Sequence, residues 1–223
     1  MDGFPSGQRE RTVNPLSQTT MVRIHPRPPK MDTNFDTMAI KIGVQFLRIE
    51  LSGKSKFRSN DMEFRFGPYA LDIDIQKTRL FYQKANNVSV DCSCASCRNF
   101  EKAVEILPDE IKYFFDSLGI NMKKPAEVYA SMVNDDGLVS YGGFYHLCGR
   151  LLSGESAWVT IKSSKKARTS YWDTSKTYSV SKDLHVSFQE DCALVEDGFP
   201  EPVLQMEIEA NIPWVLEEPN PYI

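Results

Sequence analysis

The amino-acid sequence predicts an α+β fold, in which a mostly antiparallel sheet, or two sheets, carries a pair of helices inserted at about residues 98–130. Two observations predict this architecture. Apolar residues alternate with polar ones, the period-2 pattern of half-buried strands, before residue 84 and again after residue 138. Between these two groups of strands, the apolar residues recur with the period of an amphipathic helix.

The first group of predicted strands begins at residue 40. The alternation over 40–51 changes phase at residue 47, as a β-bulge or a strand crossing between two packed sheets would produce. A Gly67-Pro68 pair then interrupts the pattern. Shorter strands are predicted at 62–66, 71–75 and 80–83, with a strand-like segment at 88–90.

Two helices are predicted in the middle of the chain. The first has an apolar stripe over 100–107, and Asn99 can cap its start. Pro108 opens the second helix at its first position, and Gly119 supplies the left-handed residue that ends it. Residues 125–129 predict a short third helix.

The second group of strands follows a polar turn at 134–137. The last strand has the most regular pattern, since five apolar residues from Leu204 to Ile212 alternate with polar ones. This pattern predicts one buried face and one exposed face. The predicted strands are 139–152, 157–161, 184–188 and 203–212.

Residues 1–30 differ from the rest of the chain. They hold five prolines and five basic residues against two acidic ones, without apolar periodicity, which predicts an unfolded tail. The strings 5–15 and 21–29 resemble the product of a transfer-RNA gene translated by mistake. That resemblance implies that the assigned start is an artefact and that translation begins at Met31 or Met38.

Residues 31–223 are expected to form a single globular α+β domain, long enough to bury one good core. They carry 21 basic and 28 acidic residues, a net charge of −7, so the body lacks an overall basic footprint for nucleic acid. No stretch approaches the ~18 apolar residues of a membrane span, and no secretory signal is recognisable. We therefore expect a cytoplasmic protein that does not contact a membrane.

Three of the five cysteines lie within six residues, immediately before the predicted helices. They are Cys92, Cys94 and Cys97. An odd number of cysteines without a secretory signal argues against a disulfide framework. The dipole and free N–H groups of a helix N-terminus stabilise thiolates there. This cysteine cluster is therefore the strongest candidate for chemistry in the sequence.

A structural zinc site is the first interpretation of the cysteine cluster. Zinc takes four tetrahedral ligands, of which the cluster supplies three. In the strand over 139–152, alternation places Phe144, His146 and Cys148 on one face. Either His146 or Cys148 can therefore complete a Cys₃His or Cys₄ site. Such a site would contribute to folding rather than to catalysis.

Two other interpretations of the cluster remain open. Cys94-Ala-Ser-Cys97 has the spacing of a dithiol motif at a helix start, with Cys92 as a resolving thiol, which would make the protein a thiol-dependent redox enzyme. Alternatively, these residues are small buried apolar side chains without chemistry. Packing alone explains three cysteines in six residues poorly, because successive side chains there point in different directions.

The same region carries a resemblance. Cys92–Tyr129 contains the strings Cys-x-Cys-x-x-Cys-Arg-Asn-Phe, Leu-Pro-x-Glu and Lys-Pro-Ala-Glu-Val-Tyr, and Tyr141-Gly-Gly-Phe-Tyr-His146 follows. Together these strings resemble an uncharacterised bacterial protein family, over most of the body. The resemblance implies a bacterial origin but no activity, and it favours His146 over Cys148 as the fourth ligand.

A basic segment is a second candidate site. Between residues 162 and 176, basic and aromatic residues are interleaved, a composition that suits an anionic partner or a single-stranded nucleic acid. A solvated hairpin loop between strands is the alternative that the sequence favours. The ten acidic residues from Asp183 onward can neutralise this segment within the fold or across a self-association interface. The segment contains Lys162, Lys165, Lys166, Arg168, Tyr171, Trp172 and Lys176.

The sequence thus favours a non-enzymatic binding or accessory module that contains a structural zinc and acts with an unknown protein partner or through self-association. A thiol-dependent redox enzyme that uses the cysteine cluster is the first alternative. An anion or nucleic-acid binder that uses the segment Lys162–Lys176 is the second, although nucleic acid is the less expected ligand.

Overall fold

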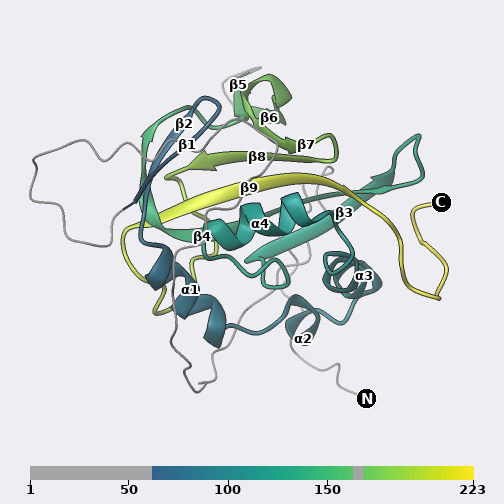
Figure 1. Ribbon diagram of the computed structural model, residues 1–223. Coiled ribbons are helices and arrows are strands. Elements are labelled where there is room, and N and C mark those ends of the chain that lie inside the picture. Colours follow the sequence, from purple (N-terminus) through teal and green to yellow (C-terminus); the bar gives the residue numbers. More distant parts are fainter. Residues whose placement is uncertain (1–61, 163–167) are drawn as a thin grey trace, which may run out of the picture.

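The α+β prediction is confirmed. The computed structural model describes residues 62–162 and 168–223, which form a mostly antiparallel sheet with four helices (Figure 1). The predicted tail over 1–30 and the predicted strand over 40–51 lie outside the described residues.

Seven strands form the main sheet, in the order β1-β2-β4-β9-β8-β7, with β3 paired to β4 beside β2. A hairpin of β5 and β6 forms a second, two-stranded sheet. The strands of the main sheet are β1 (Met62–Phe66), β2 (Tyr69–Ile73), β3 (Glu127–Val133), β4 (Val139–Ser153), β7 (Tyr178–Ser181), β8 (Leu184–Gln189) and β9 (Val203–Ile212). The other elements are β5 (Trp158–Lys162), β6 (Arg168–Trp172), α1 (Ile75–Lys84), α2 (Val88–Asp91), α3 (Ala95–Ala103) and α4 (Asp109–Ser117), with a 3₁₀ turn at Thr174–Lys176.

The long strand β4 organises the sheet. One of its edges pairs with β9, while the other edge pairs first with β3, up to Phe144, and then with β2, from Gly149. Between these two partners, side chains of α1 bind the open backbone. The Tyr82 hydroxyl donates to the carbonyl of His146 (3.0 Å) and accepts from its N–H (3.1 Å), and Thr78 Oγ1 accepts from the N–H of Cys148 (2.9 Å). Helix α1 thus satisfies backbone groups that a strand would otherwise bind.

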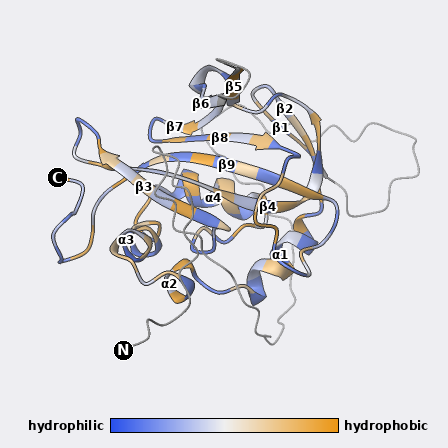
Figure 2. Ribbon diagram, turned by 180° about the vertical axis from the view of Figure 1, so that it is seen from behind, coloured by the Kyte–Doolittle hydropathy of each residue, from blue (hydrophilic) through white to orange (hydrophobic). Residues whose placement is uncertain are grey.

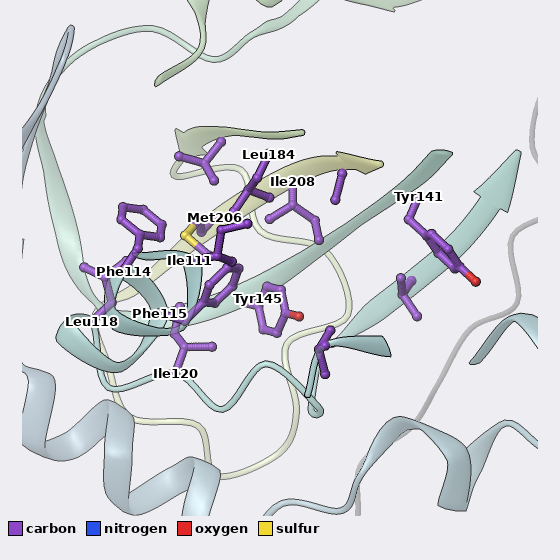
Figure 3. Close-up of a cluster of buried hydrophobic side chains, with 14 of the residues drawn as sticks. Ile111, Phe114, Phe115, Leu118, Ile120, Tyr141, Tyr145, Leu184, Met206 and Ile208 are labelled. Carbon is purple, nitrogen blue, oxygen red and sulfur yellow. The ribbon is translucent and has the colours of Figure 1, made fainter. Parts of the chain in front are cut away.

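Helix α4 covers one face of the sheet, in front of β4 and β9 in Figure 1. Its apolar side chains Ile111, Phe114 and Phe115 are buried, and the rings of Phe115 and Tyr145 meet edge to face at 5.2 Å. Figure 3 shows these side chains packed against Leu184, Met206 and Ile208 of β8 and β9. The predicted stop at Gly119 is confirmed, because this glycine has φ of +77°.

Helix α3 starts earlier than the sequence predicted, at Ala95, with Cys94 as its N-cap. Asn99, the predicted cap, is fully buried within the helix. Its amide donates to the Tyr141 hydroxyl (3.1 Å) and to the carbonyl of Pro213 (3.0 Å), and its carbonyl accepts from the N–H of Val215 (2.7 Å). Asn99 therefore ties α3 to β4 and to the C-terminal segment.

Three local predictions were wrong. Residues 80–83 belong to helix α1, which Asp74 caps by accepting the N–H of Lys77 at 2.9 Å. The strand-like segment 88–90 is the short helix α2. Residues 127–129, within the predicted third helix, begin strand β3 because the free edge of β4 offers them a ladder of backbone hydrogen bonds.

The outer face of β9 also differs from the prediction. The five apolar residues are buried, and the alternation along β9 is visible in Figure 2. However, Gln205 and Glu207, which were expected to be exposed, are buried as well. The loop after β8 contacts this face through the N–H of Ala193, which donates to Gln205 Oε1 (2.7 Å). The β5–β6 hairpin contacts it through the indole of Trp158, which lies beside Glu207. The sheet is therefore covered by helices on one face and partly covered on the other.

Within the described residues, the helices are too short or too polar to cross a lipid bilayer.

Candidate metal centre

The cysteine cluster lies at the junction of two short helices. Cys92 ends α2, where its N–H donates to the carbonyl of Val88 (3.0 Å), and Cys94 begins α3. Cys97 lies in the first turn of α3. Cys92 and Cys94 have extended backbone on either side of Ser93, and the side chains of all three cysteines converge.

The three sulfur atoms all lie within 4.8 Å of one another. The Sγ atoms of Cys92 and Cys94 are 3.1 Å apart, and Cys94 Sγ also accepts the N–H of Cys97 at 3.4 Å. All three are free thiols. A zinc ion bonded to each sulfur at about 2.3 Å would need sulfur–sulfur separations of about 3.8 Å. Small rotations of these side chains reach that geometry, so the residues fit a metal ion.

The three thiols differ in acidity. Burial acts to raise the pKa of Cys94, but the N–H of Cys97 and the neighbouring thiols more than offset it, so the pKa lies below its ordinary value. Burial raises the pKa of Cys92 and of Cys97, and the adjacent sulfur of Cys94 raises both further. One thiolate is therefore favoured without metal, whereas three thiolates need a positive ion among them.

Side chains from distant parts of the sequence contact residues next to the cysteines. The Tyr141 hydroxyl of β4 donates to the carbonyl of Ser96 (3.1 Å), and the hydroxyls of Ser96 and Tyr222 lie 2.6 Å apart. Arg98 donates to the carbonyl of Ser93 and to the carboxylate of Glu218 (2.5 Å). The C-terminal segment is thereby fastened over the N-terminal turn of α3.

The structure does not bring His146 or Cys148 to the cluster. Among the described residues, only the three cysteines form a group of metal-ligating atoms. His146 Nε2 bonds to the carbonyl of Ala193 (3.0 Å), and Cys148 Sγ contacts the carbonyl of Glu201 (3.5 Å).

The pleat of β4 explains this separation. Tyr141 reaches the cluster, but His146 lies five residues further along the strand, roughly 17 Å away in an extended chain. An odd spacing also places the two side chains on opposite faces of the sheet. The alternation correctly places Phe144, His146 and Cys148 on one face of the sheet. The helices that carry the cysteine cluster pack against the other face.

The basic segment is only partly described. Residues 163–167, which include Lys165 and Lys166, lie outside the described residues, as do the side chains of Lys162 and Arg168. Lys176 pairs with Glu155 (2.9 Å). Tyr171 is 45% exposed, whereas the ring of Trp172 meets that of Trp158 edge to face at 5.5 Å. The described residues thus form a β-hairpin, but they do not assemble a basic patch around Lys176.

Two further features were not predicted from the sequence. A cavity of about 420 Å³ between α3, α4, β8 and β9 has mainly apolar walls, with Ile111 and Ile208 among them. On the opposite face of the sheet, Glu127 and Glu207 are both buried. The polar–apolar alternation marks Glu207 as an exposed residue, and Glu127 lay in a predicted helix, so no sequence signal pointed to their burial.

No protein-family model matches the chain, and neither the curated proteins nor the solved structures include a match to it. The resemblance to a bacterial family therefore stays a prediction.

Proposed function

We propose that the protein is a non-enzymatic binding or accessory module that holds a zinc ion through Cys92, Cys94 and Cys97. The observation that carries this proposal is the convergence of three sulfur atoms within 4.8 Å. Thiolate ligands select soft or borderline ions, and zinc is the common one of these that needs no redox partner.

The fourth position of the zinc would be taken by a ligand that the described residues do not supply. Zinc lowers the pKa of its thiol ligands, so binding would release the protons of Cys92 and Cys97. The ion would thereby cross-link the end of α2 to the start of α3. Its main role would be to stabilise this junction, as metal binding to a folded site stabilises the fold.

Elemental analysis of protein purified without added metal tests the proposal. We expect about one zinc per chain, and near-complete loss of zinc in Cys94→Ser, because two remaining thiolates bind zinc weakly. Cys192→Ser is the matched control, since Cys192 lies outside the cluster and contacts the carbonyl of Val203 (3.6 Å). This control is expected to keep its zinc.

X-ray absorption at the zinc edge then identifies the ligands. Three sulfur neighbours at about 2.3 Å and one lighter neighbour at about 2.0 Å are expected. Wild-type protein without zinc, whose five thiols all react with a thiol reagent, would contradict the proposal. Equal zinc content in wild type and Cys94→Ser would contradict the assigned ligands.

One observation favours the redox alternative. Cys94 has a lowered pKa, and its sulfur lies 3.1 Å from that of Cys92. A thiolate beside a second thiol is the arrangement that dithiol enzymes use. Reduction of a protein disulfide by the metal-free form, lost in Cys94→Ser and kept in Cys192→Ser, would support this function over the structural zinc.

A further inference from the structure

The outer face of the sheet holds two buried carboxylates on either side of one aromatic ring. Glu127 of β3 and Glu207 of β9 are each 7% exposed. Both lie directly opposite Phe144 of β4, one from each side, so all three side chains share a face. The negative charge of Glu207 is one of the causes that raise the pKa of Glu127, as expected for two carboxyl groups that flank the same strand on one face.

The carboxylate of Glu207 already has hydrogen-bond donors. Gln205 Nε2 donates to its Oε1 at 2.5 Å and Gln189 Nε2 donates at 3.1 Å. The indole of Trp158 lowers the pKa of this carboxylate, so an aromatic side chain of the β5–β6 hairpin lies beside it. Two side-chain amides therefore orient the carboxylate of Glu207.

Glu127 differs from Glu207 in one respect. Its Oε1 is buried and has no hydrogen-bond partner among the described residues. Burial, and then the charge of Glu207, raises the pKa of Glu127 to about 7. A buried carboxylate without a donor is costly, and natural proteins retain such costs mainly at sites of function.

The missing partner must therefore donate hydrogen bonds and carry positive charge. An organic nitrogen cation does both, and it also gains from an aromatic ring within about 6 Å. Phe144 lies between the two carboxylates, and Trp158 contacts one of them. A hard metal ion fits less well, because Glu207 Oε1 already accepts from two amide donors and no group of three metal-ligating side chains is found here among the described residues.

We propose that Glu127 and Glu207 form a binding site for an ammonium or guanidinium group, seated over Phe144 against Trp158. Glu127 accepts the hydrogen bonds of the cation, and Glu207 contributes charge. This site lies on the face of the sheet opposite the helices and does not depend on zinc. The cation belongs either to a free small molecule or to a Lys or Arg side chain of a protein partner.

Calorimetric titration at pH 8 tests the proposal with two probes, ethylguanidinium ion and the peptide acetyl-Gly-Arg-Gly-amide. Each has a neutral counterpart of the same shape, ethylurea and the citrulline peptide. We expect saturable binding of the cations alone. Glu127→Gln should weaken their binding at least about tenfold, as the loss of a charged hydrogen-bond acceptor does.

Glu209→Gln is the matched control, because Glu209 lies on the same strand and face but pairs with Gly142 rather than Phe144. It should bind the cations within about twofold of wild type, a change of less than 0.5 kcal/mol. Tighter binding of the peptide than of ethylguanidinium assigns the site to a protein partner, and similar affinities assign it to a free small molecule.

Three results would overturn the proposal. They are no saturable binding of either cation to the wild type, unchanged binding in Glu127→Gln, and an equal loss in Glu209→Gln, which would mean that only the overall negative charge matters. A circular dichroism spectrum equal to that of the wild type establishes that Glu127→Gln is folded.

Discussion

The cysteine cluster and the carboxylate pair are assembled in opposite ways. The three cysteines lie within six residues and converge because two short helices meet there. Glu127 and Glu207 are eighty residues apart in the sequence and flank the same residue on one face of the sheet only because both strands pair with β4 at Phe144. A site of the first kind is visible in the sequence, whereas a site of the second kind depends on strand register.

The two sites also differ in what stabilises their charge. At the cysteine cluster, backbone and thiol hydrogen bonds favour one thiolate, and a metal ion would favour the other two. At the carboxylate pair, Glu207 has donors and Glu127 Oε1 has none among the described residues. The stability of the cysteine cluster should therefore depend mainly on metal, and the stability of the carboxylate pair should depend mainly on pH.

Removal of the metal is the change with the largest expected effect. A strong chelator should lower the free energy of unfolding of the wild type by about 4 kcal/mol, the value for a ligand present at a thousand times its Kd. Denaturant unfolding with and without chelator measures it. The free energy of unfolding of Cys94→Ser should not change with the chelator. If the chelator destabilised both proteins equally, metal would not be what stabilises the cysteine cluster.

Asn99→Ala is expected to have the next largest effect. It removes hydrogen bonds to Tyr141, Pro213 and Val215, so a loss of about 2–3 kcal/mol is expected from buried groups left unpaired. Thermal unfolding measures the loss, with the exposed Asn121→Ala as control. Zinc content should stay unchanged, since the ligands are held locally; a parallel loss of zinc would show that the cluster needs the tertiary contacts of Asn99.

Glu127→Gln should change how stability depends on pH. The raised pKa of Glu127, about 7, means that the folded state holds its proton more tightly than the unfolded state. The wild type therefore loses stability as pH rises from about 4.5 to 7, and the glutamine variant does not lose this part. The variant should match the wild type at pH 4 and exceed it by about 2 kcal/mol at pH 8.

Urea unfolding across this pH range, without any added cation, is the measurement. Glu196 also has a pKa raised to about 7, by burial and by nearby acidic groups, but it is present in both proteins. The difference between the two curves therefore isolates Glu127. Parallel curves for the variant and the wild type would show that Glu127 is not the unpaired carboxylate.

The smallest expected effect is kinetic. In the metal-free protein, iodoacetamide at pH 7 should modify Cys94 before Cys92 and Cys97, because its pKa is lowered and theirs are raised. Peptide mass spectrometry at short reaction times measures the order. Equal rates at the three cysteines would indicate that the hydrogen bond from the N–H of Cys97 does not set the acidity of the cluster.

Much of the fold could be predicted from the sequence, and β9, α4 and α1 show where prediction succeeded and where it failed. The predicted bounds of β9 match the structure, because its alternation is uninterrupted over ten residues. The end of α4 at Gly119 was also predicted, since a left-handed residue is required there. By contrast, residues 80–83 were predicted as a strand but form the end of α1, where Tyr82 binds the backbone of β4. These residues form a helix rather than a strand because of their partner, β4, which is distant in the sequence.

By itself, the sequence determined the α+β class, most strands and the three cysteines that meet at a helix start, because periodicity and short spacing act between near neighbours in the chain. Only the tertiary structure decided that His146 and Cys148 lie apart from the cluster, and that Glu127 lies buried on the same face as Glu207. The register of β3 and β9 on β4, and the face against which the helices pack, control both outcomes. Neither is encoded in any single stretch of residues.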